Sequence, residues 1–212
     1  MRKIRFIAVA ALMAMGTSAF AQFTNVNSSG TTAASGSKGW NSFYLQWNPS
    51  KIKYDVYSYD FTGLTLGLNR FISLAPSTPI FLEAGGAIQY SYGDKNHYQI
   101  NALSFKVPLN LTYNWQVSNV FAIAPYAGLT ARINAWGRYK YKDDDYYYGE
   151  SKGNLFSSDE GGAKRFQVGW QAGANFKFNK VYIGASYGTD FNKFDDGDGK
   201  IHTTSVTLGF IF

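Results

Sequence analysis

Apolar residues recur at every second position along much of the chain. Leu64, Leu66 and Leu68 share one face of such a segment, and threonine and glycine stand between them. The same period of two runs through 103–111, 166–176 and 206–212. Because successive side chains of a β-strand point to opposite sides, this pattern predicts strands with one apolar and one polar face.

Segments of this kind divide the chain into a series of predicted strands. Their polar faces carry mostly Gly, Ser, Thr, Asn and Gln, whereas the water-facing side of a soluble β-sandwich carries more Lys and Glu. Segments of about ten residues are long enough for tilted strands to cross a membrane. The eight predicted strands are 39–48, 58–72, 79–92, 101–114, 120–136, 164–178, 181–192 and 200–212.

The connections between these segments alternate in length. Short links occupy 75–78, 116–119 and 179–180, and longer links rich in Asp, Lys, Tyr and Gly follow the other strands. Since an unpaired backbone group in hydrocarbon costs several kcal/mol, a spanning sheet must close on itself. The pattern therefore predicts an all-β fold, an eight-stranded antiparallel up-and-down transmembrane β-barrel, with both termini in the periplasm and the acidic, Tyr-rich loop 137–163 outside the cell.

The N-terminal segment has a different composition. A basic start, an apolar run over 6–15 and the small-x-small sequence Ala19-Phe20-Ala21 predict a signal peptide over 1–21. A flexible periplasmic lead-in over 22–38 and the barrel over 39–212 follow. Removing the three basic residues of the signal peptide lowers the formal net charge from +6 to +3, which argues against a nucleic-acid partner. The sequence has 0 Cys, so no disulfide or lipoprotein anchor is expected.

Five stretches carry a resemblance to a known family: "LSFKVPLNLTYNW" (103–115), "APYAGL" (124–129), "FQVGWQAGANFKF" (166–178), "YIGASYGTDF" (182–191) and "TTSVTLGFIF" (203–212). The chain resembles the OmpA/OmpX-like outer membrane protein beta-barrel domain family, particularly the small stand-alone porin-family members of Bacteroides-type bacteria. The resemblance implies the outer membrane of a Gram-negative bacterium and a C-terminal signal read by the barrel-assembly machinery, carried by Val206, Leu208, Phe210 and Phe212. No peptidoglycan-binding domain follows, so a cell-wall tethering role is not implied.

Polar side chains on the inward face are the candidate functional site. The alternation directs these residues into the lumen: Glu83, Lys106, Tyr126, Arg132, Gln171 and Asp190. They would form either a selectivity site in a pore or a filled core, and we favour the core because eight strands enclose little more than side chains. An isolated buried charge is costly, so Glu83 is expected to pair with Lys106 or Arg132.

Other candidate chemistry is weaker. His97 and His202 invite comparison with barrel enzymes that modify lipid A, but the final strand offers His202 no acidic partner, so no catalytic residue is expected. Asp196 and Asp198 resemble a cation loop without the ligand spacing of a calcium site, and weak cation binding by 142–150 rests on charge alone. No cofactor or metal is expected.

We therefore expect an integral outer-membrane protein with a structural or surface-interaction role, a closed lumen and long extracellular loops. The expected partners are membrane lipids, lipopolysaccharide and the assembly machinery, and the expected state is a monomer. A narrow porin-like channel for ions or small solutes is the alternative, and a lipid A-modifying enzyme is a third hypothesis. Single-channel conductance separates the first two.

Overall fold

The computed structural model describes residues 39–75, 78–95, 98–142, 150–157 and 162–212. The predicted signal peptide, the whole of the predicted lead-in and the stretch 143–149 lie outside the described residues. Within those described ranges, no helix is long and apolar enough to cross a membrane.

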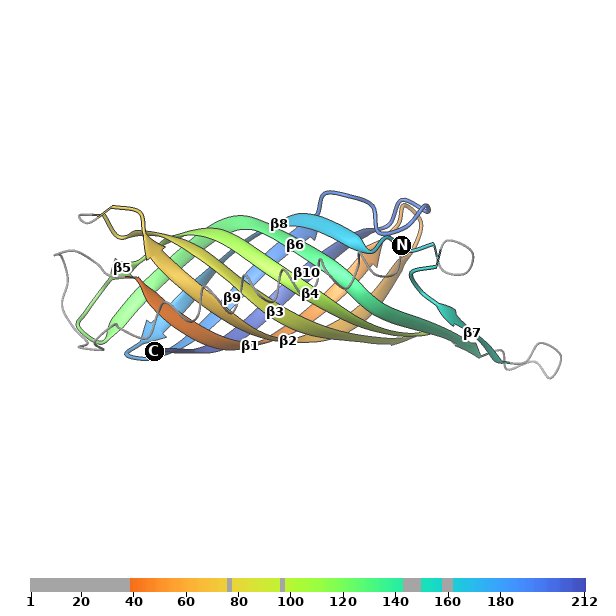
Figure 1. The fold of residues 1–212 in the computed structure, drawn as a ribbon, viewed down its shortest axis with the longest axis horizontal. Helices are drawn as coiled ribbons and strands as arrows, with labels where there is room; N and C mark the ends of the chain where they lie inside the picture. The colour runs from red at the N-terminus through yellow and green to blue at the C-terminus, as the bar shows by residue number, and fades with distance from the viewer. Residues whose placement is uncertain (1–38, 76–77, 96–97, 143–149, 158–161) are drawn as a thin grey trace, which may run out of the picture. The chain divides into compact units, whose positions relative to one another are not determined.

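Long antiparallel strands form a closed wall. Each pairs with its neighbour in the chain, β4 pairs with β6, and β10 returns to pair with β1. The strands wind obliquely around the barrel (Figure 1). The predicted eight-stranded barrel is confirmed, and its wall strands are β1 (Trp40–Lys53), β2 (Ser58–Ser73), β3 (Ile80–Lys95), β4 (Tyr98–Tyr113), β6 (Phe121–Lys142), β8 (Phe166–Phe178), β9 (Val181–Asp190) and β10 (Lys200–Ile211).

The C-terminal residue belongs to the closing ladder. The Phe212 amide donates to the Asn41 carbonyl at 3.0 Å, and the Asn41 amide donates to the Phe212 carbonyl at 3.3 Å. The register continues from Ser42 opposite Ile211 toward the other end of β1. The last strand therefore leaves no open edge at the point where the sheet closes.

The polar and apolar faces lie as the alternation predicts. In β1, Trp47 is 54% exposed, whereas its neighbour Asn48 is 0% exposed. In β10, Leu208 is 54% exposed and Thr207 is 6% exposed. Buried polar residues beside exposed apolar ones reverse the arrangement of a water-soluble domain, and this reversal suits a barrel surrounded by lipid.

Strand β1 continues five residues beyond its predicted end at residue 48. Proline has no N–H to donate, and the pairing of β1 with β10 omits Asn48 and Pro49 and resumes at Ser50 in the same register. On its other side, Pro49 remains paired with Thr62. The proline therefore interrupts one ladder without ending the strand.

The predicted loop 137–163 is partly a strand pair, which corrects the sequence-based prediction. Strand β6 continues to Lys142, and β7 (Glu150–Asn154) pairs with it, with Arg138 opposite Asn154. A register shift opposite Leu103/Ser104 leaves Ala135 as an extra residue, and such a bulge reverses the alternation beyond it. We call β7 together with 137–142 of β6 and 98–102 of β4 the sheet arm. Figure 1 shows β6 and β7 projecting beyond their neighbours.

Tight turns join strands at the other end. A short strand, β5 (Trp115–Gln116), pairs with the start of β6, and Asn179 adopts a φ of 53° in the link between β8 and β9. This left-handed conformation is one that asparagine tolerates better than most residues. The short links thus gather at the end of the barrel where β10 finishes (Figure 1).

Two inward tyrosines lie against glycines of the neighbouring strands. A Cβ atom at Gly67 would lie 2.4 Å from the Tyr44 ring, and one at Gly209 would lie 2.1 Å from the Tyr182 ring. Each glycine stands directly opposite its tyrosine in the register. Because these two glycines have no side chain, both tyrosine rings can lie across the wall inside a narrow barrel.

Candidate functional site

Side chains fill the barrel interior in successive layers. At the end with the short links, the Trp40 ring stacks on Phe71 with centroids 4.7 Å apart and contacts Phe81 at 4.4 Å. The Lys177 ammonium lies 3.8 Å from the Trp40 ring centroid and donates to the Asn114 side-chain oxygen at 3.0 Å. This aromatic layer occupies one end of the lumen.

Glu83 is the centre of the next layer. It is 5% exposed and accepts hydrogen bonds from the amide of Asn69, from the amide of Asn110 at 3.0 Å and from the hydroxyl of Thr112 at 3.3 Å. The Gln171 amide in turn donates to the Asn110 oxygen at 2.9 Å. Neighbouring strands thus surround the carboxylate with donors, as a buried charge requires.

Arg132, one of the two partners expected for Glu83, instead forms an ion pair with Asp190 at 2.5 Å. Lys106, the other expected partner, lines the same small cavity as Glu83, and the hydrogen bonds to the Glu83 carboxylate come from the amide and hydroxyl donors described above. The reason lies in β8, the strand between Arg132 and Asp190. Gly169 stands opposite Asp190, and a Cβ there would lie 2.9 Å from the Asp190 carboxylate, so the glycine leaves room for the guanidinium to reach across.

A small cavity remains in the polar middle of the lumen. Its volume is about 20 Å³, and Glu83, Lys106, Tyr126 and Gln171 are among its lining residues. A cavity of this size holds about one water molecule. Four of the six predicted lumen residues therefore meet around one space, and the other two form the neighbouring ion pair.

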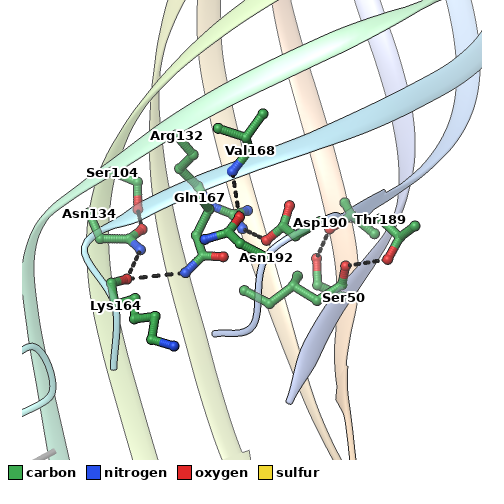
Figure 2. Close-up of polar contacts among 12 residues, drawn as sticks. Ser50, Ser104, Arg132, Asn134, Lys164, Gln167, Val168, Thr189, Asp190 and Asn192 are labelled. Atoms are coloured by element: carbon green, nitrogen blue, oxygen red, sulfur yellow. Dashed lines mark hydrogen bonds and ion pairs between the residues drawn. The ribbon is translucent and has the colours of Figure 1, made fainter. Parts of the chain in front are cut away.

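A layer of amide and hydroxyl contacts follows toward the long loops (Figure 2). The Ser104 hydroxyl donates to the Asn134 oxygen at 2.7 Å, and the Asn134 amide donates to the Lys164 carbonyl at 3.2 Å. The Gln167 amide donates to the same carbonyl at 3.2 Å. These bonds fasten the chain before β8 inside the mouth of the barrel.

An apolar cluster closes the mouth above this layer, and the sequence did not reveal it. Leu155 and Phe156 follow β7 and fold inward, where they meet Phe194 from the link between β9 and β10. In the sequence, the one sign of this cluster is the apolar pair Leu155-Phe156 within the polar stretch 137–163. We call this cluster the cap, and its buried members are Ile52, Ala102, Leu155, Phe156, Ala163, Phe194 and Ile201.

A tyrosine and an aspartate connect two loops beside the cap. The Tyr54 hydroxyl donates to the Asp195 carboxylate, which also accepts the amides of Gly197 at 3.1 Å and Gly199 at 3.2 Å. Burial raises the pKa of Tyr54, and the hydrogen bond to Asp195 raises this pKa further. Tyr54 lies between β1 and β2, so this contact fixes the first loop to the last one.

The other aspartates of the last loop pair with lysines. Asp196 lies 3.6 Å from the Lys164 ammonium, and Asp198 lies 2.5 Å from that of Lys193. In the part of the chain that the structure describes, no three His, Cys, Asp or Glu side chains are placed to hold a metal ion. In the last loop, Asp195 thus accepts turn amides, and Asp196 and Asp198 form ion pairs.

His202 lies on the outer wall, on the same face of β10 as Thr204. Its Nδ1 atom is 2.7 Å from the Tyr187 hydroxyl, and the Tyr187 ring packs edge-on to Trp170 with centroids 6.0 Å apart. Ester hydrolysis by a histidine needs a nucleophile and an orienting acid within hydrogen-bond reach. The described partner of His202 is instead a phenol in an aromatic group. His97 lies outside the described residues.

A closed barrel of eight antiparallel strands, polar within and apolar without, is the fold of small outer-membrane proteins. No family model and no curated protein matches the chain. Among solved structures, Ail, the attachment invasion locus protein of Yersinia pestis, matches 83% of this chain and 100% of its own at 14% identity, with a TM-score of 0.51. Neisserial surface protein A matches 85% and 100% at 12% identity, with a TM-score of 0.52. The outer membrane enzyme PagL matches 80% and 98% at 12% identity, with a TM-score of 0.51. These likenesses define the fold.

Proposed function

We propose that this chain is an integral protein of the outer membrane of a Gram-negative bacterium, with a closed lumen and a structural or surface-interaction role. The apolar outer wall supports residence in a bilayer, because exposed positions such as Leu66 and Leu109 would otherwise face water. The barrels of similar fold named above include outer-membrane proteins, which supports the choice of membrane. The proposed membership of the OmpA/OmpX-like family and the proposed origin in a Bacteroides-type bacterium are supported by the five sequence stretches quoted above.

The filled lumen carries the proposal of a closed barrel. The cavity around Glu83 has a volume of about 20 Å³, the Trp40 layer lies toward one end, and the cap lies at the other. A conducting path for hydrated ions needs a continuous column of water, whereas these layers place buried side chains across the barrel. With the lumen closed, the structural or interaction role is assigned to the outer surface of the barrel and its loops.

The alternation of link lengths supports an orientation. Outer-membrane barrels keep short turns in the periplasm and send longer loops outside the cell. On this rule the cap and the sheet arm face the exterior, and Phe212 lies at the periplasmic interface. The partners that follow are membrane lipids and lipopolysaccharide around the wall, together with the assembly machinery that would read Phe210 and Phe212. The proposal assigns no catalytic role, and it takes the protein as a monomer.

Conductance in a planar bilayer tests the closed lumen. Refolded protein is inserted beside an open porin as a positive control, and an unheated gel establishes that the barrel is folded. We expect a baseline without sustained steps, because the interior contacts would have to break before ions could pass. Sustained open steps from folded protein would contradict the closed lumen and support the channel alternative.

A further inference from the structure

Basic side chains gather on the outer wall at the long-loop end of the seam, where the first and last strands pair. Two opposite pairs of this kind lie side by side in the register of β1 with β10. The pair between them, Ile52 opposite Ile201, is buried in the cap, so the basic pairs point away from the lumen. We call these two pairs the seam patch, and they are Lys53 with Lys200, and Lys51 with His202.

The upper pair of the seam patch places two like charges against each other. Lys53 and Lys200 are both exposed, and within the described ranges neither forms an ion pair. Directly opposite residues have their Cβ atoms about 5 Å apart, and like charges at such positions destabilise a sheet. An anion between the two ammonium groups would turn this repulsion into attraction.

The acidic residues around the seam patch leave its positive charge in excess. Asp60, on the same outer face, lies 3.3 Å from the Lys51 ammonium and offsets that charge. The aspartates of the last loop and of the lumen have the partners described above. Asp55, in the loop after β1, is exposed and forms no ion pair with a described lysine. Three lysines against Asp60 and Asp55 leave a net positive charge.

The depth of the seam patch matches the headgroup region of a bilayer. In the proposed orientation Phe212 lies at the periplasmic interface, and Lys200 precedes it by twelve positions. With a rise of about 3.4 Å per residue and a tilt of about 40°, Lys200 lies roughly 31 Å from Phe212 along the membrane normal. The apolar band is about 25 Å tall, so Lys200 lies about 6 Å beyond its far edge, within a headgroup region about 5–8 Å thick.

Lipid-facing side chains lie directly below the seam patch. Val206 of β10 and Trp47 of β1 stand opposite each other, and both are exposed on the outer wall. Tyr187 and Trp170 lie beside His202, and tyrosine and tryptophan concentrate at membrane interfaces. A lipid with its headgroup at the lysines thus has its acyl chains against the apolar wall.

We propose that the seam patch binds a phosphate group of lipopolysaccharide in the outer leaflet. The ammonium groups of Lys53 and Lys200 would hold the phosphate oxygens from two sides, since lysine binds phosphate as a point charge. His202 would donate from Nε2 while its Nδ1 accepts the Tyr187 hydroxyl proton. The proposal rests on the proposed function, whose orientation places this end of the barrel outside the cell, and it adds the residues that hold the lipid across the seam.

Native mass spectrometry of the refolded barrel, titrated with lipid A in detergent, measures how many lipids bind and how tightly. Lipid A stripped of its phosphates is the second probe, and phosphatidylglycerol is the third. The variants are Lys200→Gln and the double variant Lys53→Gln/Lys200→Gln. Lys180→Gln is the control, because it removes one charge from the link at the opposite end of the barrel. An unheated gel establishes that each variant is folded.

We expect one lipid A to bind saturably, with an affinity at least threefold weaker in Lys200→Gln, at least tenfold weaker in the double variant and unchanged in Lys180→Gln. Removal of the phosphates should abolish this binding. Phosphatidylglycerol should bind at least threefold more weakly, because a phosphate monoester carries a charge of about −1.5 to −2 at pH 7, whereas a diester carries a single charge.

Equal affinity of the folded double variant and wild type for lipid A would overturn the proposal, and so would absence of binding by folded wild type. Equal binding of the phosphate-free probe would overturn the role of the phosphate, and equal binding of phosphatidylglycerol would overturn the assignment to lipopolysaccharide. Because conductance does not depend on these exposed lysines, any of these failures leaves the closed lumen of the proposed function to be judged separately.

Discussion

Replacing a leucine of the outer wall by arginine tests whether lipid surrounds the barrel. Leu109 is 46% exposed and stands opposite Leu129, itself 50% exposed. It precedes Tyr113, the last residue of β4, by four positions. With a rise of about 3.4 Å per residue and a tilt of about 40°, Leu109 lies roughly 10 Å from that end of the strand along the membrane normal.

That depth sets the expected magnitude. The apolar band of an outer-membrane barrel is about 25 Å tall, so Leu109 lies near its midplane, where arginine costs about 2–4 kcal/mol. Leu74 provides a matched control, because it is 53% exposed and follows the end of β2 at the short-link end of the barrel. An arginine near the interface costs about 0–1 kcal/mol. Leu109→Arg should therefore destabilise the barrel by at least about 2 kcal/mol more than Leu74→Arg does.

Urea unfolding in phospholipid vesicles, followed by tryptophan fluorescence, measures both free energies. If water surrounded the wall, both leucines would be ordinary exposed positions and either substitution would change stability by about 0.5 kcal/mol or less. Equal, small effects at the two sites would thus refute the assignment of the outer wall to lipid.

Two further substitutions test the interior and the loops by the same unfolding measurement. Glu83→Ala leaves several buried donors without an acceptor and should cost about 3 kcal/mol or more, whereas Glu83→Gln keeps an acceptor and should cost about 1 kcal/mol; equal costs would contradict the described network. Because the folded pKa of Tyr54 is raised above the usual value of about 10, its contribution to stability is fully present below pH of about 10 and is lost at higher pH. Tyr54→Phe should remove this loss of stability at high pH. If the free energy of unfolding changed with pH in the same way for the variant and the wild type up to pH of about 11, the result would count against the Tyr54 contact.

The period-two pattern was enough to predict the wall, because alternation is a local property of each strand. The predicted segments 164–178 and 200–212 match β8 and β10 to within two residues. The same alternation placed Glu83 and Asp190 in the lumen, where both are buried. Since lipid and lumen impose opposite preferences on neighbouring residues, even a single sequence carries this information.

Features that depend on distant partners were not predictable. The Arg132–Asp190 pair depends on the register of β8, which places Gly169 between the two side chains. The cap joins Leu155 to Phe194, and nothing in the sequence near either residue signals the other. The part of the sheet arm formed by 137–142 and β7 was predicted as a loop because the bulge at Ala135 breaks the alternation before β6 ends. In each case the deciding contact lies between residues far apart in the sequence.

Labelling of single cysteines in β10 tests the central claim most directly. The sequence has 0 Cys, so one cysteine at Val206 or Thr207 gives a unique site. Val206 is 46% exposed on the wall, and Thr207 is 6% exposed in the lumen. In folded protein in vesicles, a lipid-soluble thiol reagent should label Val206→Cys, and a small water-soluble reagent should label neither variant. Rapid labelling of Val206→Cys by the water-soluble reagent would contradict a lipid-facing wall, and rapid labelling of Thr207→Cys by it would contradict a closed lumen.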